Sequence, residues 1–350
     1  MGIAILGHFG GKKCFNDGQT VKTVALYDAL VRNGIDVEKV DTYYVKKNPI
    51  LFCCQFIRML TKDQRVIVLL SSNGRRMFFP VLYFLSKYFR KRIYHYGIGG
   101  RLAREIQENE HIKKYVQSFE GNWMESHMLV ENLNKLGITN AVYVPNFKKL
   151  KVLSPDDLSV DVTQPYKFCT FSRVMEEKGI SDAVAAIEEI NQRSGQCLAE
   201  LDIYGPVEAD YRERLEAILN ESQVCRYCGV VNASQSVEII MGYYCLVFPT
   251  HWKHEGIPGT IIDALSAGVP IISRKWQYCT EMIEDKKTGL IYPFEEPDKL
   301  VDAIEYAVSH QANILEMRKN CLKKANEYRE EVVIKQILSL LHINQGEKTA

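Results

Sequence analysis

Short apolar runs alternate along the chain with longer segments in which apolar residues recur every three or four positions. The apolar runs predict buried strands of parallel sheets at 3–9, 66–72, 167–172, 200–206 and 245–250. The helical spacing predicts helices at 21–34, 179–190, 210–222, 260–268 and 298–309. Strands and helices that alternate in this way predict an α/β protein with two doubly wound, Rossmann-like domains.

A polar stretch with two prolines divides this pattern. It runs from residue 148 to residue 165 and has the composition of a linker. We therefore expect an N-terminal domain over 1–150, a linker over 151–165 and a second domain over 166–326. A chain of 350 residues is long enough for two domains of ordinary size, each with its own core.

The segment from residue 245 to residue 272 carries the clearest chemical signal. An apolar strand ended by Pro249 is followed by a loop that contains Gly256 and Gly259, and then by a helix that Gly268 stops. This arrangement presents free backbone N–H groups and the positive end of a helix dipole at the carboxyl end of a strand. The backbone from Gly256 to Thr260 is therefore expected to bind a phosphate.

Two carboxylates flank these glycines. Glu255 lies on the loop, and Asp263 follows eight positions later in the first turns of the helix. An anion-binding loop between two hydrogen-bond acceptors suits a ligand that carries both phosphates and hydroxyls. The segment therefore predicts a nucleotide-sugar site.

A second candidate group lies after the strand at 167–172. Arg173 and Lys178 place a forked cation and a point cation in one strand-to-helix loop, which suits a diphosphate. The alternative is a surface Arg/Lys pair in a charge-rich loop. The sequence has no Asp-x-Asp pair of the kind that holds a diphosphate through a divalent ion, so we expect no metal and no cofactor.

The segment EGIPGTIIDALSAGVPII resembles the E-x7-E segment of the family 4 retaining glycosyltransferases, which have the GT-B fold. Asp263 stands where that family has its second Glu. The segment from Arg173 to Gly179 matches the R-x4-K-G segment of the family, and GKKCFNDGQTVKT resembles the start of transferases that act in bacterial polysaccharide assembly, of the capsular, exopolysaccharide or O-antigen kind. The resemblance implies two Rossmann-like domains that face each other across a cleft, with the last helix, over 327–350, crossing back to the first domain.

The resemblance also implies a function. It indicates a metal-independent retaining transferase that moves a hexose or N-acetylhexosamine from a UDP-sugar to a sugar hydroxyl of a growing, polyprenyl-diphosphate-linked polysaccharide unit. The implied catalytic residues are Arg173, Lys178, Glu255 and His95, where Glu255 holds sugar hydroxyls. The implied donor-binding residues, with Asp263 on the ribose, are Gly10, Gly11, Gly18, Gln19, Tyr204, Gly205, Val230, Gly256, Ile257, Pro258, Gly259, Thr260 and Asp263.

The charge is distributed unevenly, although the net charge is only +1. Residues 1–150 hold 23 Lys+Arg against 12 Asp+Glu, a net of +11, whereas the rest of the chain has a net of −10. This excess indicates either ordinary solvated surface or docking on an anionic membrane or lipid diphosphate. The aromatic helix expected at 77–92 has the same two interpretations, packing on the sheet or contact with lipid headgroups. No nucleic-acid-binding motif is present, so no nucleic-acid partner is expected.

The sequence also indicates a cellular location. It starts without the basic region and cleavage site of a signal peptide, and its longest uncharged apolar run, 77–85, is far below the roughly 20 residues of a membrane span. Ten scattered cysteines in such a chain are typical of reduced thiols. We expect a cytoplasmic protein, peripheral on the inner face of the membrane if the basic half docks there.

Three alternatives to a metal-independent transferase remain. Cys225 and Cys228 with His251 and His254 have zinc-ligand types, but the long interval between the pairs contains a helix and a strand, which argues against a zinc finger. An epimerase or hydrolase of the same fold would need a second acid/base pair, which the sequence does not reveal. A non-catalytic nucleotide-sugar-binding protein is suggested by Asp263 in place of Glu.

Overall fold

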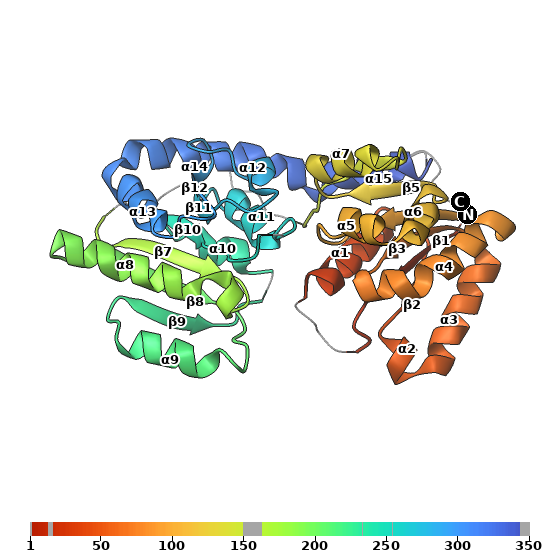
Figure 1. Cartoon of the computed structure of the whole chain (residues 1–350), viewed down its shortest axis with the longest axis horizontal. Coiled ribbons are helices and arrows are strands. Elements are labelled where there is room, and N and C mark those ends of the chain that lie inside the picture. Colours follow the sequence, from red (N-terminus) through yellow and green to blue (C-terminus); the bar gives the residue numbers. More distant parts are fainter. Residues whose placement is uncertain (1, 13–16, 150–162, 233, 254, 344–350) are drawn as a thin grey trace. The chain divides into compact units, whose positions relative to one another are not determined.

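The computed structural model describes residues 2–12, 17–149, 163–232, 234–253 and 255–343, apart from the side chain of residue 63 (Figure 1). The chain divides into two compact units. The first contains the chain up to Lys149 and the described part that starts at Tyr328, and the second contains the chain between them. Residues 151–162 of the expected linker lie outside the described residues.

The first unit is built on a six-stranded parallel sheet in the order β2-β1-β3-β4-β5-β6. Its strands are β1 (Gly2–Gly7), β2 (Val37–Asp41), β3 (Asp63–Leu69), β4 (Arg92–Tyr96), β5 (Gly121–Met124) and β6 (Ala141–Tyr143). Its helices are α1 (Gly18–Arg32), α2 (Tyr44–Lys47), α3 (Pro49–Lys62), α4 (Ser72–Phe89), α5 (Leu102–Glu108), α6 (Glu110–Gln117), α7 (His127–Lys135) and α15 (Glu330–Leu340).

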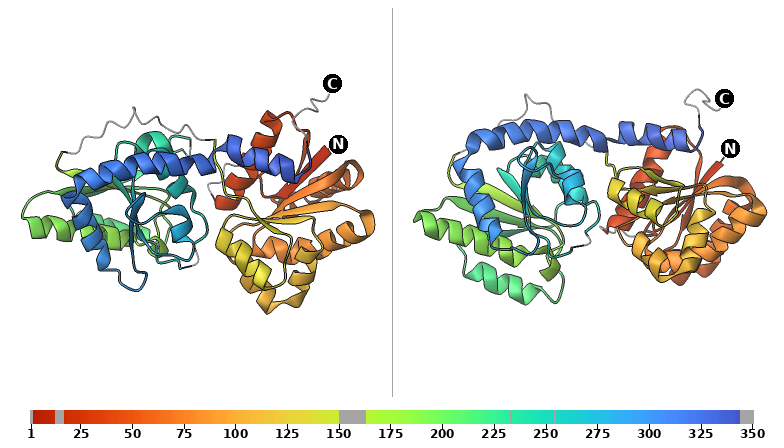
Figure 2. Two further views of the ribbon diagram at one scale, coloured as in Figure 1. Left: turned by 90° about the horizontal axis from the view of Figure 1, so that it is seen from above. Right: turned by 45° about the horizontal axis from the view of Figure 1, so that its top comes forward.

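Alternate residues of these strands face opposite sides of the sheet, which gives the unit two apolar layers. Helices cover both sides of the sheet (Figure 2). On one side Ile3 and Ile5 of β1 pack with α1 and α15. On the other side the ring of Phe79 in α4 meets the ring of His95 in β4 at 5.1 Å. Both faces of the sheet are therefore covered, as the continuous apolar runs predict.

The last helix belongs to the core of the first unit although it is distant in sequence. Val333, Ile334 and Ile337 of α15 are buried in the cluster that contains Ile3 and Ile5. A two-pronged ion pair ties α15 to α1, because Arg32 Nε donates to Glu330 Oε1 at 3.0 Å and Nη2 donates to Oε2 at 2.5 Å. This hydrogen bonding raises the pKa of Arg32 above its ordinary value.

The second unit repeats the architecture with the strand order β12-β11-β10-β7-β8-β9, all parallel. The strands are β7 (Tyr166–Phe171), β8 (Ala199–Tyr204), β9 (Cys225–Gly229), β10 (Cys245–Phe248), β11 (Ile271–Arg274) and β12 (Gly289–Tyr292). The helices are α8 (Ile180–Ser194), α9 (Arg212–Asn220), α10 (Ser236–Ile240), α11 (Gly259–Ser266), α12 (Cys279–Met282), α13 (Lys299–Ser309) and α14 (Gln311–Ala325), with 3₁₀ turns at Glu176–Lys178 and Asn326–Tyr328.

The winding of each sheet reverses at one point. In the second sheet β7 leads to β8 and β9 on one side, while β10 leads to β11 and β12 on the other, so the reversal lies between β7 and β10. In the first sheet it lies between β1 and β3. Ligands of open α/β sheets bind at the carboxyl ends of the strands at such a switch point. A ligand site is therefore expected at the segments that follow β7 and β10.

Two helices differ from the sequence expectation. The helix expected at 77–92 spans Ser72–Phe89 and contains Pro80, so its first turns precede the apolar run and Arg92 starts β4. The helical pattern near the chain end is broken at Asn326–Tyr328, because Arg329 is extended and pairs with Lys148. In the part of the chain that the structure describes, no helix is long and apolar enough to cross a membrane.

Candidate active site

The chemical groups gather where β7 and β10 end. The segment after β7 carries Arg173 and, in the 3₁₀ turn, Lys178, while the segment after β10 carries Thr250 and Glu255. Lys178 Nζ and Glu255 Oε2 form an ion pair in which the two side chains are only 14% and 18% exposed. The structure thus brings together two of the expected catalytic residues from segments 77 positions apart.

A glycine makes this approach possible. Gly179 follows Lys178 with φ +67°, and a Cβ there would lie 2.1 Å from the carbonyl oxygen of Pro249. A backbone hydrogen bond also joins the two segments, because the His251 N–H donates to the Glu177 carbonyl at 2.8 Å. Only a residue without a side chain allows the Lys178 turn to lie against the end of β10.

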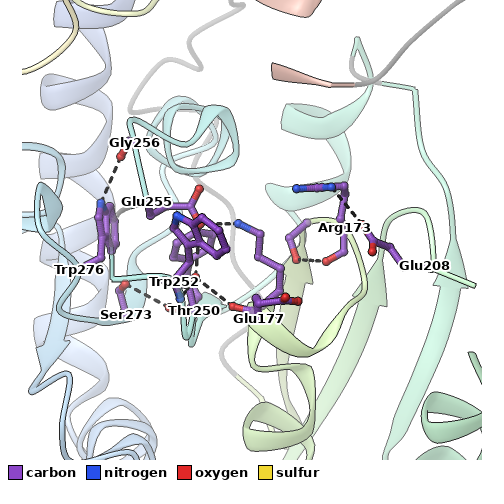
Figure 3. Close-up of polar contacts among 12 residues, drawn as sticks. Arg173, Glu177, Glu208, Thr250, Trp252, Glu255, Gly256, Ser273 and Trp276 are labelled. Atoms are coloured by element: carbon purple, nitrogen blue, oxygen red, sulfur yellow. Dashed lines mark hydrogen bonds and ion pairs between the residues drawn. The ribbon is translucent and has the colours of Figure 1, made fainter. Parts of the chain in front are cut away.

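Thr250 links the segment after β7 to the segment after β10. It is fully buried, and its hydroxyl lies 3.3 Å from both the Glu177 carbonyl and Glu255 Oε2 (Figure 3). The same oxygen accepts the N–H of Trp252 at 3.1 Å. Thr250 therefore orients the carboxylate of Glu255 and the loop that bears it.

The loop after Glu255 is held from the other side by Trp276. Its indole N–H donates to the carbonyl of Gly256 at 3.2 Å, and its buried ring meets Phe248 of β10 (Figure 3). The loop then enters α11 through Pro258, which has extended backbone. At this N-terminus the hydroxyl of Thr260 is buried and has no hydrogen-bond partner among the described residues. An unpaired donor beside a positive helix end suits an anionic ligand.

Arg173 lies apart from the buried pair. Its guanidinium is 59% exposed and donates to Glu208 Oε1 at 3.0 Å. The backbone beside it is held closely by β8, because a Cβ on Gly205 would lie 1.7 Å from the Ser172 carbonyl oxygen. The backbone beside Arg173 therefore lies against the end of β8, whereas its exposed guanidinium pairs with Glu208.

Asp263 is more enclosed than the sequence suggests. It is 5% exposed in α11, and Oδ2 accepts the hydroxyl of Ser236 from α10 at 2.9 Å. The carboxylate therefore also links two helices. Of the remaining loop positions, Ile257 is buried, and Gly256, Pro258 and Gly259 are partly exposed.

The expected nucleotide-facing residues of the neighbouring strands fall at their carboxyl ends. Tyr204 ends β8, stacks on Phe171 at 4.4 Å between ring centres, and shares a 2.8 Å hydrogen bond with the hydroxyl of Tyr243. Val230 follows β9 and is 57% exposed. Both therefore lie at the carboxyl ends of β8 and β9, the strands that continue from β7 away from β10.

The expected glycine loop of the first unit follows β1, at the switch point of its own sheet. Gly10 and Gly11 both have positive φ, and Asp41 holds the loop by accepting the N–H groups of Phe9 at 2.9 Å and Gly11 at 2.8 Å. Residues 13–16 lie outside the described residues. Gly18 starts α1, and the amide of Gln19 donates to the Leu69 carbonyl at the end of β3 at 3.2 Å.

His95 does not fit the catalytic role expected for it. Its side chain is fully buried in β4, between Phe79 and Asn122, with Nδ1 3.3 Å from Asn122 Oδ1. Burial lowers the pKa of His95 to about 3, so the imidazole is neutral. The sequence placed a histidine near the carboxyl end of a strand, but the alternation of side chains turns it into the core. His95 is therefore a core residue of the first unit.

The zinc alternative can be followed only in part, because His254 lies outside the described residues. Cys225 and Cys228 are on β9, the edge strand, whereas His251 follows β10 and has Nε2 2.8 Å from Asp182 Oδ2. In the described part of the chain, no group of three or more His, Cys, Asp or Glu side chains is arranged to hold a metal.

Sequence reasoning missed several residues that position the site. Besides Thr250 and Trp276, Asp182 of α8 accepts Arg274 Nη2 of β11 at 2.6 Å and lies against His251. These contacts fix the loop after β10 to its neighbours. Only the apolar-to-polar change at Thr250, directly after Pro249, was visible as a signal in the sequence.

The comparisons with known proteins agree with this geometry. Residues 159–328, which include Arg173, Lys178 and Glu255, match the family model described as Glycosyl transferases group 1. The chain is therefore a glycosyltransferase. This glycosyltransferase is 21% identical to an uncharacterized glycosyltransferase of Methanocaldococcus jannaschii, with 93% of each chain covered.

Two solved structures show the fold of the glycosyltransferase. HepE of Anabaena, in complex with UDP, matches with a TM-score of 0.76 and 14% identity over 98% of this chain and 100% of HepE. Sucrose-phosphate synthase of Thermosynechococcus elongatus matches with a TM-score of 0.76 and 16% identity over 97% and 98%. Two parallel, doubly wound sheets and these likenesses establish the expected GT-B fold.

Proposed function

We propose that this glycosyltransferase is a metal-independent, retaining enzyme that transfers a hexose or N-acetylhexosamine from a UDP-sugar to a sugar hydroxyl of a lipid-linked polysaccharide unit. The observation that carries the proposal is the enclosed Lys178–Glu255 pair at the switch point, beside the N-terminus of α11. The pair places a cation for the diphosphate in direct contact with a carboxylate for the sugar. The UDP bound to HepE supports the choice of nucleotide.

In the proposed reaction the bond between the sugar C1 and the diphosphate oxygen breaks while C1 bonds to the acceptor oxygen on the same face. The acceptor proton leaves with the departing diphosphate. Lys178, Arg173, the N–H groups at the start of α11 and the Thr260 hydroxyl stabilise the charge that develops there. Glu255 holds sugar hydroxyls, Asp263 holds the ribose, and Tyr204, Gly205 and Val230 lie beside the nucleotide.

The first unit is assigned to the acceptor, and Gly10 and Gly11 after β1, with Gly18 and Gln19 at the start of α1, are assigned to donor binding. The two side-chain cations take the place that a divalent ion has in metal-dependent transferases. The lipid-linked acceptor and a cytoplasmic, peripheral location are part of the same proposal, supported by the +11 charge of residues 1–150.

The test measures consumption of UDP-sugars in EDTA, with and without a panel of saccharide acceptors. Donor consumption that requires an acceptor, and a product with unchanged anomeric configuration, supports the proposal. Equal consumption without acceptor indicates a hydrolase or epimerase, and UDP binding without consumption indicates a binding protein. Activity that EDTA abolishes and Mg²⁺ or Mn²⁺ restores contradicts metal independence.

A further inference from the structure

Two helices of the first unit expose apolar side chains that the donor site does not use. On α4, Met77, Val81, Phe84 and Tyr88 recur at intervals of four, three and four positions, which places them on one stripe of the helix. Their exposed fractions lie between 42% and 62%. The rings of Phe84 and Tyr88 contact each other at 4.8 Å, so the stripe is continuous.

The neighbouring helix α3 has a similar outward stripe. Ile50 is 78% exposed and Ile57 is 58% exposed, with the exposed Cys53 and Cys54 between them. The rings of Phe52 in α3 and Phe78 in α4 meet at 5.8 Å, so the two helices contact each other at this point. We call their exposed apolar residues the α3–α4 face, which consists of Ile50, Ile57, Met77, Val81, Phe84, Tyr88 and Phe89.

The charge of the first unit is concentrated around this face. Residues 44–92 hold 11 Lys+Arg and a single acidic residue, Asp63, a net of +10. This segment therefore accounts for nearly all of the +11 of residues 1–150. Six of its basic side chains are exposed and have no ion pair within the described ranges: Lys46, Lys47, Lys62, Arg76, Lys87 and Arg90.

The combination of exposed apolar and basic side chains restricts which partner can bind the α3–α4 face. A second copy of the chain would bring two sets of these six exposed cations together, and their repulsion opposes such a dimer. A nucleic acid would pair with the cations but would leave the aliphatic stripe in water. An anionic bilayer satisfies both, because its headgroups attract the cations while its interfacial layer receives Val81, Phe84 and Ile57.

We propose that the α3–α4 face docks the protein on an anionic phospholipid bilayer. The apolar stripe enters the interface, and Lys46, Lys47, Arg76 and Lys87 contact the headgroups. This inference concerns a surface of the first unit and does not depend on the donor site of the second. It specifies the surface through which a lipid-linked acceptor would become accessible.

The experiment measures co-sedimentation of the whole chain with vesicles of phosphatidylcholine alone or with added phosphatidylglycerol. The wild type should bind only the acidic vesicles, and binding should fade as the screening length falls from about 30 Å at 0.01 M salt to about 10 Å at 0.1 M. A charge variant with Lys46, Lys47, Arg76 and Lys87 changed to Gln should lose about tenfold or more in partitioning. An apolar variant, Val81→Ser with Phe84→Ser, should lose binding at every salt concentration.

Matched controls carry the same changes elsewhere. The charge control changes four exposed basic residues of other surfaces to Gln: Lys167, Arg212, Lys323 and Lys335. The apolar control changes the exposed Leu315 and Val332 to Ser. Both controls should bind vesicles like the wild type, and thermal unfolding should show that every variant is folded.

Three results would overturn the proposal. These are equal binding to neutral and acidic vesicles, wild-type binding by both face variants, and a wild-type dimer that binds no vesicles and that Val81→Ser with Phe84→Ser dissociates. Binding of UDP should be unchanged in the face variants, because the donor site lies in the second unit. A failure of docking is thereby distinguished from a failure of the proposed transfer reaction.

Discussion

The ion pair between Lys178 and Glu255 makes a prediction about the free nucleotide. If Lys178 neutralises the diphosphate, it must exchange its contact with Glu255 for one with the ligand. Replacing Glu255 by Gln removes the competing anion and leaves a similar shape. Glu255→Gln should therefore bind UDP more tightly than the wild type, even though it transfers sugar more slowly.

The magnitude follows from the burial of the pair. Exposed ion pairs contribute about 0.2–1 kcal/mol, whereas two charges 4 Å apart near a protein surface interact by about 4 kcal/mol. With exposures of 14% and 18%, we expect about 1–2 kcal/mol, or UDP binding roughly five- to thirtyfold tighter. Lys178→Gln should weaken UDP by about 1.5–3 kcal/mol, the value of a hydrogen bond to a charged group.

Isothermal titration with UDP measures both variants and the double variant Lys178→Gln/Glu255→Gln. In the double variant the gain from Glu255→Gln should vanish, since no cation remains to be released. The matched control is the exposed pair Lys319–Glu316 of α14, 3.4 Å apart, whose Gln variants should leave UDP affinity unchanged. If Glu255→Gln weakens UDP binding, or acts equally with and without Lys178, the assignment of Lys178 to the diphosphate is refuted.

Three further predictions concern the scaffold. Gly179→Ala should abolish UDP binding, because the added Cβ would collide with the Pro249 carbonyl. Gly195→Ala is the control and should keep UDP binding, because Gly195 has nearly the same φ of +68° but open space around it. Equal titration curves for the two variants would contradict the importance of the close approach. Asp263→Ala should weaken UDP binding by about 1.5–3 kcal/mol if the carboxylate holds the ribose. Ser236→Ala removes the hydrogen bond between the two helices from the other side and should leave UDP binding unchanged. Equal losses of affinity in the two variants would show that Asp263 only links the helices. The folded-state pKa of His95, about 3, is below its ordinary 6.5, so the unfolded chain binds the extra proton first and stability is lost as pH falls from about 6.5 toward 3. Denaturant unfolding should show a loss of up to about 4 kcal/mol over this range that His95→Gln lacks. An identical pH dependence in that variant would show that His95 is not the group that titrates.

The sequence by itself determined much of the donor segment. A strand ended by Pro249, the glycines of the loop and the helical spacing of 260–268 are local patterns, and the structure has β10, the loop and α11 in that order. The alternation of strands and helices likewise predicted the α/β class, because apolar runs of strand length have to be buried on both faces of a sheet.

The tertiary structure alone decided which residues meet. Lys178 and Glu255 are far apart in sequence, and their contact depends on β7 and β10 lying side by side and on Gly179 fitting against Pro249. Thr250 and Trp276 became positioning residues through contacts with Glu177 and Gly256 that no spacing in the sequence indicates.

The same reason explains what local patterns left undecided. His95 was within a few positions of a strand end, but whether it pointed to the ligand edge or into the core depended on the packing of α4 against β4. The chain end was recognisable as helical, and its expected return to the first domain came from the family resemblance, but its burial with Ile3 and Ile5 depended on the apolar surface of β1, which lies more than 300 positions earlier in the chain. Local propensity and periodicity act within a few turns of chain, whereas burial and charge pairing are settled only when distant segments pack together.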